Sequence, residues 1–359
     1  MTERLNKVRA IFDKLDIDGI LVADGANMKY LTGFYGGTGD GLVLVGKDGA
    51  ALITDNRYEE DMRNRIADDV QLLITRDYWA VAMVAAQRFK IAKLGFEDSL
   101  PYRDFDYIDE NFVGEDIAPT PGLLEALREV KDEAELAALR KAGEVAVAGF
   151  NELLEQLHAG MTEREVANLL DYIMKQKGAD KPSFDTIVAA GINGALPHAQ
   201  ATDKVIEKGE LVTIDFGYFV DDYTSDVTRT IAFGEVSEEL QNIYGIVKHA
   251  NEVALAGIHA EMDASKIDDL ARDVINEAGY GKNYEHSTGH GVGLAIHEGP
   301  AVSGRSEDTI HAGMLLTIEP GIYLPGIGGV RIEDDVITTK DGIENLTAGI
   351  SKELIVIDK

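Results

Sequence analysis

The sequence of 359 residues contains no cysteine. Without a thiol, the chain cannot form a disulfide, a thiolate zinc site, an iron–sulfur cluster or a cysteine nucleophile. It also lacks any apolar run approaching the ~18 residues of a membrane-spanning helix. The first residues, Met1–Lys7, are polar and charged, and no apolar run follows them as it would in a secretory signal. We therefore expect a soluble, cytoplasmic protein without a membrane partner.

Basic residues are scarce relative to acidic ones. The chain carries 34 Lys and Arg against 64 Asp and Glu, which gives a formal net charge of −30 at pH 7. Such a charge repels phosphates and argues against nucleic acid or an anionic membrane surface as a partner. We expect most of this charge to serve solubility and a smaller part to gather around cations. Hydrophobic residues (45%) and charged residues (27%) occur in the proportions of an ordinary globular protein.

Residues 1–122 have the pattern of a small α/β domain. Thr2 can cap a helix whose apolar positions recur at helical spacing. Two prolines and a glycine end regular structure at Ile117–Gly122, so we place a domain boundary there. The chain is longer than one hydrophobic core usually serves, and residues 123–359 are expected to form a second domain. The other elements predicted in the first domain are strands over 19–22, 41–45, 50–53 and 94–96 and a helix over 77–89.

The second domain is expected to begin with helices and to continue as strands and tight turns. A stretch rich in Ala, Glu, Lys and Leu predicts a long helix over Leu123–Leu157. Thr162 and Glu165 then form a capping box that opens another helix. Two further helices are predicted over 237–256 and 265–278. The fold class is therefore α/β (α+β), with a smaller N-terminal and a larger C-terminal domain.

Two stretches of the C-terminal domain, Ile206–Gly217 and Ile310–Gly321, resemble each other. Hydrophobic residues, a glycine and an acid occupy matching positions in both. Two halves related by pseudo-symmetry would direct these acids into a common centre. The polar residues that match are a histidine ahead of each stretch, an acid within it and an acid behind it: His198, Asp215 and Asp226 in the first, and His297, Glu319 and Glu333 in the second.

The two acids of each half flank a turn. Asp215 and Asp226 are symmetric about the turn region between them, so a regular hairpin would place them opposite each other with Cβ atoms about 5 Å apart. Glu319 and Glu333 flank a glycine-rich turn in the same way. Like charges that face each other across a hairpin destabilise it unless a cation lies between them. The sequence therefore predicts that the four carboxylates bind metal.

One histidine is expected to join these acids. His290 lies in Ser287–Gly293, a run of small residues that lets a ring nitrogen reach a buried ion. The spacing of this run does not fit the fingerprints of dinucleotide-binding or phosphate-binding loops. Four carboxylates and one imidazole suit Mn²⁺, while the imidazole leaves Co²⁺, Fe²⁺ and Zn²⁺ open. Bridging carboxylates typically hold two ions ~3.5–4 Å apart, an arrangement suited to hydrolysis.

Taken together, these residues resemble the pita-bread metallopeptidases, the family of aminopeptidase P, prolidase (Xaa-Pro dipeptidase) and methionine aminopeptidase. The resemblance implies a pseudo-symmetric pita-bread catalytic domain, and residues 1–122 resemble the family's creatinase-type N-terminal domain. The motifs that carry it are Thr213–Gly217, Ser225–Thr230, Gly289–Leu294, Ile318–Gly321 and Arg331–Asp334, with Thr54–Tyr58 in the N-terminal domain. The metal ligands that it implies are Asp215, Asp226, His290, Glu319 and Glu333.

The resemblance also implies a mechanism. Two divalent ions would share a hydroxide that attacks the scissile carbonyl, and they would stabilise the developing oxyanion. Asp226 and Glu333 would bridge the ions, and Glu319 would pass a proton to the leaving proline nitrogen. His198 and His297 would hydrogen-bond to the substrate and the tetrahedral intermediate. The other implied positions are His286, which lines the proline pocket, and Arg331 and Tyr323, which orient the carboxylates beside the substrate.

The substrate follows from the branch of the family. The two-domain length and the histidines His198, His286 and His297 resemble the proline-specific members, which cut peptides with proline at the second position. The short N-terminal domain and the stretch Phe184–His198 favour an aminopeptidase P-like enzyme, and prolidase, restricted to dipeptides, is the alternative. A metal-free creatinase-like enzyme or a binding relative would lack several ligands that this chain keeps. The family further implies a homodimer.

Four other histidines are expected to have no part in the site, because they lie in helical or loop contexts without partners. They are His158, His249, His259 and His311.

Overall fold

The computed structural model describes residues 2–359, and over these residues the chain divides into two compact units, the first ending at Arg128. This division falls at the last residue of helix α6 (Leu123–Glu129), whereas the prolines and glycine before that helix suggested an earlier boundary. Helix α6 belongs to the first unit because its side chains bond there. Asn27 donates from Nδ2 to Glu125 Oε1 at 2.6 Å, and Arg128 Nη1 donates to Asn27 Oδ1 at 2.8 Å.

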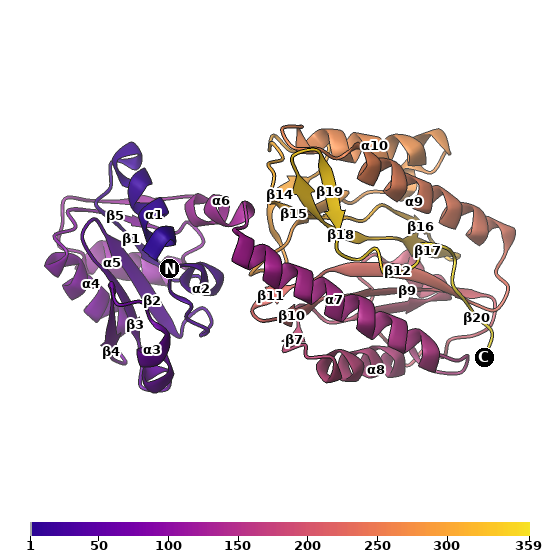
Figure 1. Ribbon diagram of the computed structural model, residues 1–359, viewed down its shortest axis with the longest axis horizontal. Helices are drawn as coiled ribbons and strands as arrows, with labels where there is room; N and C mark the ends of the chain where they lie inside the picture. Colours follow the sequence, from indigo (N-terminus) through magenta and orange to yellow (C-terminus); the bar gives the residue numbers. More distant parts are fainter. Residues whose placement is uncertain (1) are drawn as a thin grey trace. The chain divides into compact units, whose positions relative to one another are not determined.

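The first unit is a mixed sheet with helices packed on it (Figure 1). The strand order is β4-β3-β2-β1-β5-β6, with β2 antiparallel to both β1 and β3 and the remaining pairs parallel. Helices α4 and α5 share one core with the strands, through side chains such as Met83 and Ile108. The elements are α1 (Thr2–Leu15), β1 (Gly19–Val22), α2 (Gly25–Thr32), β2 (Gly41–Gly46), β3 (Ala50–Thr54), α3 (Glu59–Arg65), β4 (Val70–Ile74), α4 (Tyr78–Arg88), β5 (Lys93–Phe96), α5 (Tyr102–Asn111), β6 (Asp116–Pro119) and α6.

The fully buried strands β1, β2 and β3 and the helices α1 and α4 lie where the sequence predicts them. Several elements, among them β4 and α5, were not predicted from the sequence. In β4 only Val70 is fully buried, and in α5 only Ile108. Most residues of both elements therefore lie outside the fully buried core.

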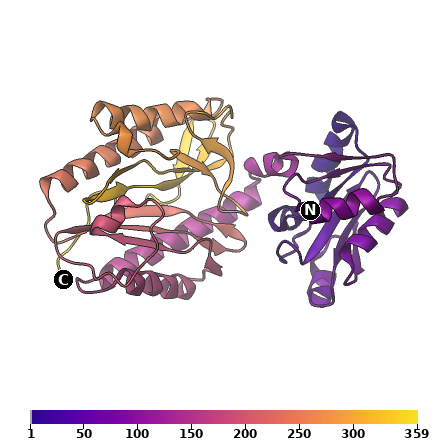
Figure 2. The ribbon, with the colours of Figure 1, turned by 180° about the vertical axis from the view of Figure 1, so that it is seen from behind.

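In the second unit, α7 and α8 cover one side of a layer of strands and α9 and α10 cover the other (Figures 1 and 2). Each pair of helices has its own apolar core against the strands, with Phe150 central to one and Val247 to the other. The elements are α7 (Glu133–Gln156), α8 (Glu163–Gln176), β7 (Lys181–Pro182), β8 (Ile187–Ala190), the 3₁₀ helix η1 (Gly191–Ala195), β9 (Glu210–Phe216), β10 (Tyr218–Val220), β11 (Tyr223–Thr224), β12 (Val227–Phe233), α9 (Glu238–Gly257), α10 (Ala264–Glu277), η2 (Gly281–Asn283), β13 (Gly289–Gly291), β14 (Glu298–Val302), β15 (Leu315–Ile318), β16 (Gly321–Leu324), β17 (Gly328–Arg331), β18 (Asp334–Thr339), β19 (Gly342–Asn345) and β20 (Val356–Ile357).

The long helix predicted over Leu123–Leu157 is two helices. Asp132 caps α7, accepting from the backbone N–H of Ala134 and Glu135, while the Glu135 side chain accepts from the Asp132 N–H at 2.9 Å. This capping box starts a new helix and separates α7 from α6. The capping box at Thr162 is confirmed, and it opens α8.

The two halves of the second unit repeat one another. In each half a pair of helices precedes the strands that carry the acids, α7 and α8 in the first and α9 and α10 in the second. An isolated bridge joins Thr162 to Val205, and its counterpart joins Asp263 to Thr309. These bridges fix the second helix of each pair to the segment just before its acid-bearing strand. The internal repeat of the sequence is thus a repeat of structure.

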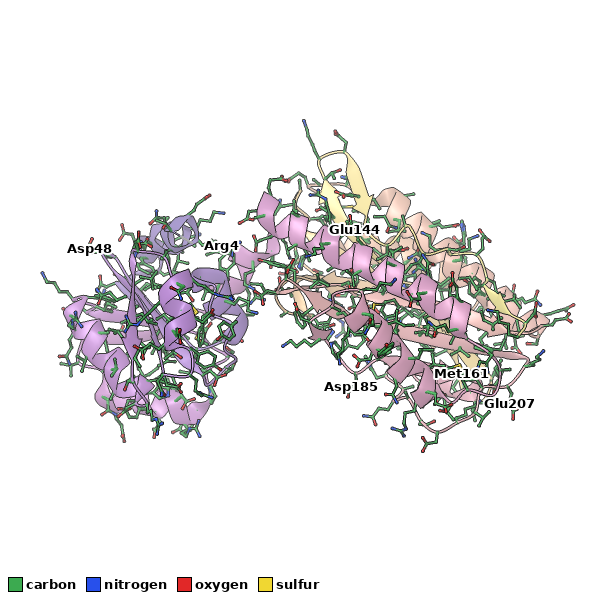
Figure 3. The ribbon with its side chains drawn as sticks, turned by 60° about the horizontal axis from the view of Figure 1, so that its bottom comes forward. Arg4, Asp48, Glu144, Met161, Asp185 and Glu207 are labelled. Atoms are coloured by element: carbon green, nitrogen blue, oxygen red, sulfur yellow. The ribbon has the colours of Figure 1, made fainter. Side chains whose placement is uncertain are left out.

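The negative charge lies largely on exposed side chains. Asp48, Glu144, Asp185 and Glu207 are exposed, and Figure 3 shows them at the surface of their units. In residues 2–359, no helix is both long and apolar enough to span a bilayer.

Candidate metal centre

The first pair of acids is delivered by the hairpin of β9 and β12. Asp215 lies opposite Thr228 in this pairing, not opposite Asp226, so the expected register is wrong. The chain turns at Asp221 and Asp222, whose φ angles are 49° and 74°, as in a type I′ turn. This turn is centred further along the chain than the midpoint of the two acids. Because Asp tolerates positive φ, the turn can form at Asp221 and Asp222. This turn position sets a register that differs from the one expected from the sequence.

Asp226 reaches Asp215 through a bend in the hairpin. The chain bends at Gly217, between β9 and β10, where a Cβ atom would lie 2.4 Å from the carbonyl oxygen of Ser225. The backbone N–H of Asp226 donates to Asp335 Oδ2 at 2.8 Å. Glycine at the bend and an acid from the other half therefore place Asp226.

The second pair of acids follows the predicted register. Ile318 pairs with Asp334 in β15 and β18, and Gly321 pairs with Arg331 in β16 and β17. Glu319 and Glu333 lie between these pairs and so stand across from each other. The expectation for this hairpin is confirmed.

The carboxylates of the two hairpins converge with one histidine. In the described part of the chain, Asp215, Asp226 and Glu333 each offer an oxygen, and these atoms all lie within 4.8 Å of one another. His290 Nε2 lies 3.5 Å from Asp226 Oδ2 and 3.8 Å from Glu319 Oε1. Asp215 Oδ1 is buried and accepts no hydrogen bond in the structure. The structure thus brings together every residue that was expected to bind metal.

Asp226, Glu319 and Glu333 have raised pKa values because they lie close together in a largely buried site. Burial raises the pKa of Asp226 and of Glu333 well above the usual range, and the charges of the neighbouring acids raise both further. Burial also raises the pKa of Glu319 to about 8; Arg331 opposes this shift and Asp215 adds to it. Divalent cations would relieve this repulsion and satisfy the free oxygen of Asp215. The donors therefore fit a site for hard or borderline divalent ions.

His290 is prepared to act as a neutral ligand. Burial lowers its pKa to about 4. Its Nδ1–H donates to the carbonyl oxygen of Gly291 at 2.9 Å, which leaves Nε2 with its lone pair directed at the acids. A hydrogen bond of this kind commonly fixes the tautomer of a metal-binding histidine.

Arg331, Tyr323 and His286 form a chain of hydrogen bonds beside the acids. Arg331 Nη2 donates to Asp215 Oδ2 at 2.6 Å, and its Nη1 donates to the Tyr323 hydroxyl at 2.8 Å. That hydroxyl donates to His286 Nε2 at 2.9 Å, because His286 Nδ1–H donates to the carbonyl of Ser287. Burial lowers the pKa of His286 to about 4 and raises that of Tyr323 to about 12, so both are neutral near pH 7.

A cavity of about 480 Å³ opens over these groups. His297 stands at its wall, with its ring centroid 4.6 Å from that of His290. His198 is exposed and lines this cavity and also two adjoining hollows of about 590 and 450 Å³. The lining residues expected from the sequence are His198, Asp215, Asp226, His286, His290, His297, Glu319, Tyr323, Arg331 and Glu333.

The four histidines set aside by the sequence argument are exposed, and none of them lines the cavity. They are His158, His249, His259 and His311.

Three residues at the site were given no role from the sequence. Thr228 donates from Oγ1 to Glu333 Oε2 at 2.6 Å and accepts from Arg331 Nε at 3.1 Å. Asp335 holds the backbone of Asp226, and Thr317 Oγ1 accepts from the backbone N–H of His290 at 3.0 Å. Thr228 lies within the motif Ser225–Thr230, and no other feature of the sequence pointed to a role for it. Thr317 and Asp335 flank ligands but act through contacts between segments far apart in the chain.

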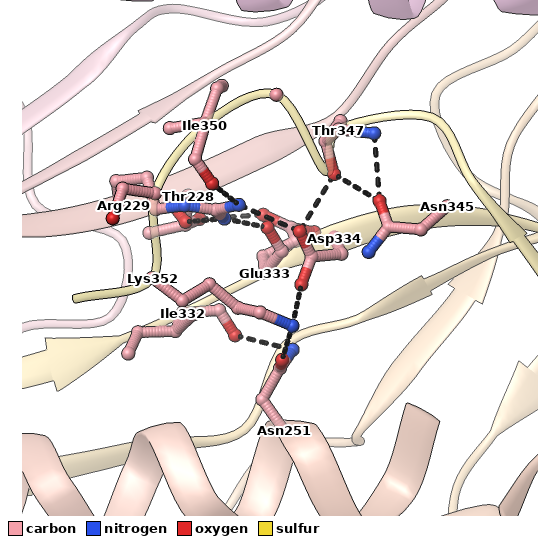
Figure 4. Close-up of polar contacts among 12 residues, drawn as sticks. Thr228, Arg229, Asn251, Ile332, Glu333, Asp334, Asn345, Thr347, Ile350 and Lys352 are labelled. Carbon is pink, nitrogen blue, oxygen red and sulfur yellow. Dashed lines mark hydrogen bonds and ion pairs between the residues drawn. The ribbon is translucent and has the colours of Figure 1, made fainter. Parts of the chain in front are cut away.

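A buried ionic network lies behind Glu333 (Figure 4). Arg229 Nη2 donates to Asp334 Oδ1 at 2.7 Å, and the Arg229 guanidinium also donates to the backbone carbonyl of Glu333. Lys352 Nζ lies 3.2 Å from Asp334 Oδ2. Burial tends to raise the pKa of Asp334, but the charges of Arg229 and Lys352 outweigh it and hold that pKa below its usual value.

The chain is similar to known peptidases along nearly its whole length. An Xaa-Pro dipeptidase of Pyrococcus horikoshii is 38% identical over 355 residues, which cover 99% of each chain. The structure of an Xaa-Pro dipeptidase from Bacillus anthracis matches with a TM-score of 0.95 at 42% identity, covering 99% of each chain. That of an X-Pro aminopeptidase from Thermotoga maritima matches with a TM-score of 0.88 at 36% identity, covering 96% of this chain and 99% of that one.

Family descriptions match both units. Residues 4–130 match the creatinase/prolidase N-terminal domain, and residues 137–340 match metallopeptidase family M24. The second match spans more than half of the chain and contains all the acids and histidines that line the cavity. The fold and this match together show that the chain is an enzyme that belongs to metallopeptidase family M24.

Proposed function

We propose that this enzyme is a dinuclear Xaa-Pro dipeptidase, which hydrolyses the bond in front of proline. The observation that carries the proposal is the convergence of four buried or partly buried carboxylates and one neutral imidazole at the floor of a cavity. Asp215 and Asp226 would hold one divalent ion, and His290 and Glu319 the other, with Asp226 and Glu333 shared. Mn²⁺ suits this set, since most of its donors are carboxylate oxygens.

When bound, the two ions would supply an activated water and a Lewis acid for the scissile carbonyl. The protein side chains have the other tasks. Arg331 and Thr228 orient carboxylates through their hydrogen bonds to Asp215 and Glu333. Glu319 is placed to carry a proton to the leaving nitrogen, because it lies at the cavity floor beside His290.

The wall of the cavity supports recognition of proline. His286 and Tyr323 are neutral and joined by a hydrogen bond, and their ring centroids lie 5.5 Å apart. They present a rigid and mostly apolar surface on which a pyrrolidine ring can pack. His198 and His297 are exposed at the wall and can donate to the carbonyl oxygen of the substrate or its tetrahedral intermediate.

The preference for a dipeptide rests on the names of similar proteins. Of the three described above, two are Xaa-Pro dipeptidases and one is an X-Pro aminopeptidase. This reverses the inclination towards aminopeptidase P that the N-terminal domain and the stretch before His198 suggested. The volume of about 480 Å³ is in the usual range for a small-molecule pocket.

Aminopeptidase P remains the second candidate on one observation. Of the described residues that line the cavity, Arg331 alone is a lysine or arginine, and its guanidinium is occupied by Asp215, Tyr323 and Thr228. The carboxylate of a bound dipeptide would therefore lack a free guanidinium or ammonium partner there. The hollows that adjoin at His198 would also admit a longer peptide.

One assay separates these functions. The protein is stripped with EDTA, reconstituted with Mn²⁺, and given Ala-Pro, Ala-Pro-Ala and Ala-Ala in parallel, with products measured by chromatography. We expect cleavage of Ala-Pro, no cleavage of Ala-Ala, and no activity before Mn²⁺ is restored. Preference for Ala-Pro-Ala would identify an aminopeptidase P. Failure to cut either proline peptide with two ions bound would overturn the proline specificity, and failure to bind metal would favour a creatinase-like or binding role.

The same expectations extend to the assembly and location of the enzyme. We propose that it acts as a homodimer in the cytoplasm on peptides with proline at the second position. Its mass in solution, measured by light scattering, tests the first point.

A further inference from the structure

A single amide ties together the two chain segments that carry the facing glutamates. Asn251, on α9, is fully buried. Its Nδ2 donates to the carbonyl oxygen of Ile318 at 2.9 Å and to that of Ile332 at 3.4 Å. These residues immediately precede Glu319 and Glu333. The side chain thus holds the two chain segments at the step before both acids enter the site. Figure 4 shows the amide beside Ile332.

Lys352 fixes the direction of that amide. Its Nζ donates to Asn251 Oδ1 at 3.0 Å, so the amide oxygen faces the ammonium group and the NH₂ faces the two carbonyls. The same ammonium group lies 3.2 Å from Asp334 Oδ2, on the residue that follows Glu333. One cation is therefore connected to the residues on both sides of Glu333 and, through the Asn251 amide, to the residue before Glu319.

We propose that Asn251 and Lys352 are positioning residues, which hold Glu319 and Glu333 at the spacing that divalent cations require and so raise the affinity of the site. This inference rests on the proposed metal centre. It goes further by assigning part of the metal affinity to the C-terminal segment, which contributes no ligand. Outer hydrogen-bond partners of this kind typically account for about 10–100-fold in metal affinity or activity.

The C-terminal segment has other anchors, so the fold does not depend on the Lys352 side chain. The Tyr244 hydroxyl donates to the Lys352 backbone carbonyl at 3.1 Å, and Lys248 forms an ion pair with Glu353. Strand β20 pairs with β12 further along. The Lys352 side chain is mostly covered, but methionine keeps most of its length and volume, so Lys352→Met leaves no large cavity.

The test measures Mn²⁺ binding to metal-free protein by titration calorimetry. In Lys352→Met, we expect an affinity about 10-fold or more weaker than in the wild type. At limiting Mn²⁺ the apparent kcat should fall while KM for the peptide stays unchanged. Lys352→Arg, which keeps a cation that can donate, should restore most of the affinity. Asn251→Ala leaves the pair of Lys352 with Asp334 in place and should weaken Mn²⁺ binding by a similar factor.

Lys248→Met is the matched control, because it breaks a contact between the same helix and the same segment at the surface. It should bind Mn²⁺ like the wild type. Wild-type affinity in a folded Lys352→Met or Asn251→Ala protein, with folding checked by circular dichroism, would overturn the inference. An equal loss in Lys248→Met would also overturn it, since the effect would then be general. If the wild type binds no Mn²⁺, the metal centre itself is refuted instead.

Discussion

Thr228 is the residue at which the two halves of the site meet. Its backbone stands opposite Asp215 in one hairpin, and its carbonyl accepts from the N–H of Glu333 in the other at 3.0 Å. Its hydroxyl lies between Glu333 and Arg331, donating to the first and accepting from the second. A hydroxyl can do both at once, and each of its neighbours is a buried ionisable side chain. Threonine therefore sets the orientation of acids from both halves.

The metal ligands can be tested one by one. Because changes to residues that only orient a ligand cost about 10–100-fold, loss of a ligand in His290→Ala or Glu319→Ala should lower kcat/KM for an Xaa-Pro peptide by more than about 100-fold. The circular dichroism spectrum should stay nearly unchanged. His158→Ala removes an exposed histidine outside the cavity and should keep wild-type kinetics. Near wild-type turnover of either ligand variant at saturating Mn²⁺ would refute the assignment.

At the scale of secondary-structure elements, the two acid-bearing hairpins differ in a way that the repeat conceals. The hairpin of Glu319 and Glu333 keeps one register through β15–β18 and β16–β17. The hairpin of Asp215 also keeps one register, through β9–β12 and β10–β11, but that register sets Asp215 opposite Thr228 and leaves Asp226 across from the bend at Gly217. Equivalent positions in sequence therefore do not guarantee equivalent positions in the strands.

The bend makes a prediction about Gly217. A Cβ atom there would lie 2.4 Å from both Ser183 Oγ and Ser225 O, and the latter is backbone next to Asp226. Gly217→Ala should destabilise the protein by about 1–3 kcal/mol, as overpacking does, and should weaken Mn²⁺ binding. Denaturant unfolding and calorimetry measure the two effects.

Gly245→Ala provides a control of opposite sign. Gly245 lies in α9, and a Cβ atom there would meet nothing within 4 Å. Alanine should stabilise this helix by about 0.5–1 kcal/mol and leave metal binding unchanged. If Gly217→Ala were as stable as the wild type with unchanged affinity, the close approach at the bend would not shape the site.

At the scale of the whole molecule, the buried acids couple stability to pH and metal. In the metal-free protein the pKa of Glu319 rises from 4.5 to about 8 on folding, and those of Asp226 and Glu333 are raised as well. Between pH 4.5 and pH values of about 8, the folded protein holds protons that the unfolded chain has released. Its stability therefore falls as pH rises through this window. The pKa values of His286 and His290 fall from 6.5 to about 4 on folding. These two histidines therefore make stability rise with pH, but only below pH 6.5.

The melting temperature in EDTA should accordingly be lower at pH 8 than at pH 6.5. Mn²⁺ should raise it, and by more at pH 8, because the ions displace the protons that the acids would otherwise retain. Differential scanning calorimetry at the two pH values, with EDTA or with Mn²⁺, measures both effects. A melting temperature in EDTA that does not fall between pH 6.5 and pH 8 would contradict the pKa values of the acids.

The sequence alone determines much of this protein. Apolar periodicity and capping residues predict α1, α4, α8, α9 and α10 and the buried strands, because these signals are local to the chain. The internal repeat and the five residues from Asp215 to Glu333 predict a carboxylate-rich centre, since side-chain chemistry is carried by residue type. The glycine-rich turn also predicts the register that places Glu319 across from Glu333.

Only the tertiary structure decides the rest. The turn at Asp221 and Asp222 sets a register that symmetry of the sequence could not reveal. Asn251 and Lys352 carry no motif, and they come to the backbone beside the glutamates only when α9 and the C-terminal segment pack there. The reason is physical: a motif records which groups are present nearby in the chain, whereas the position of a ligand depends on hydrogen bonds between segments that only folding brings together.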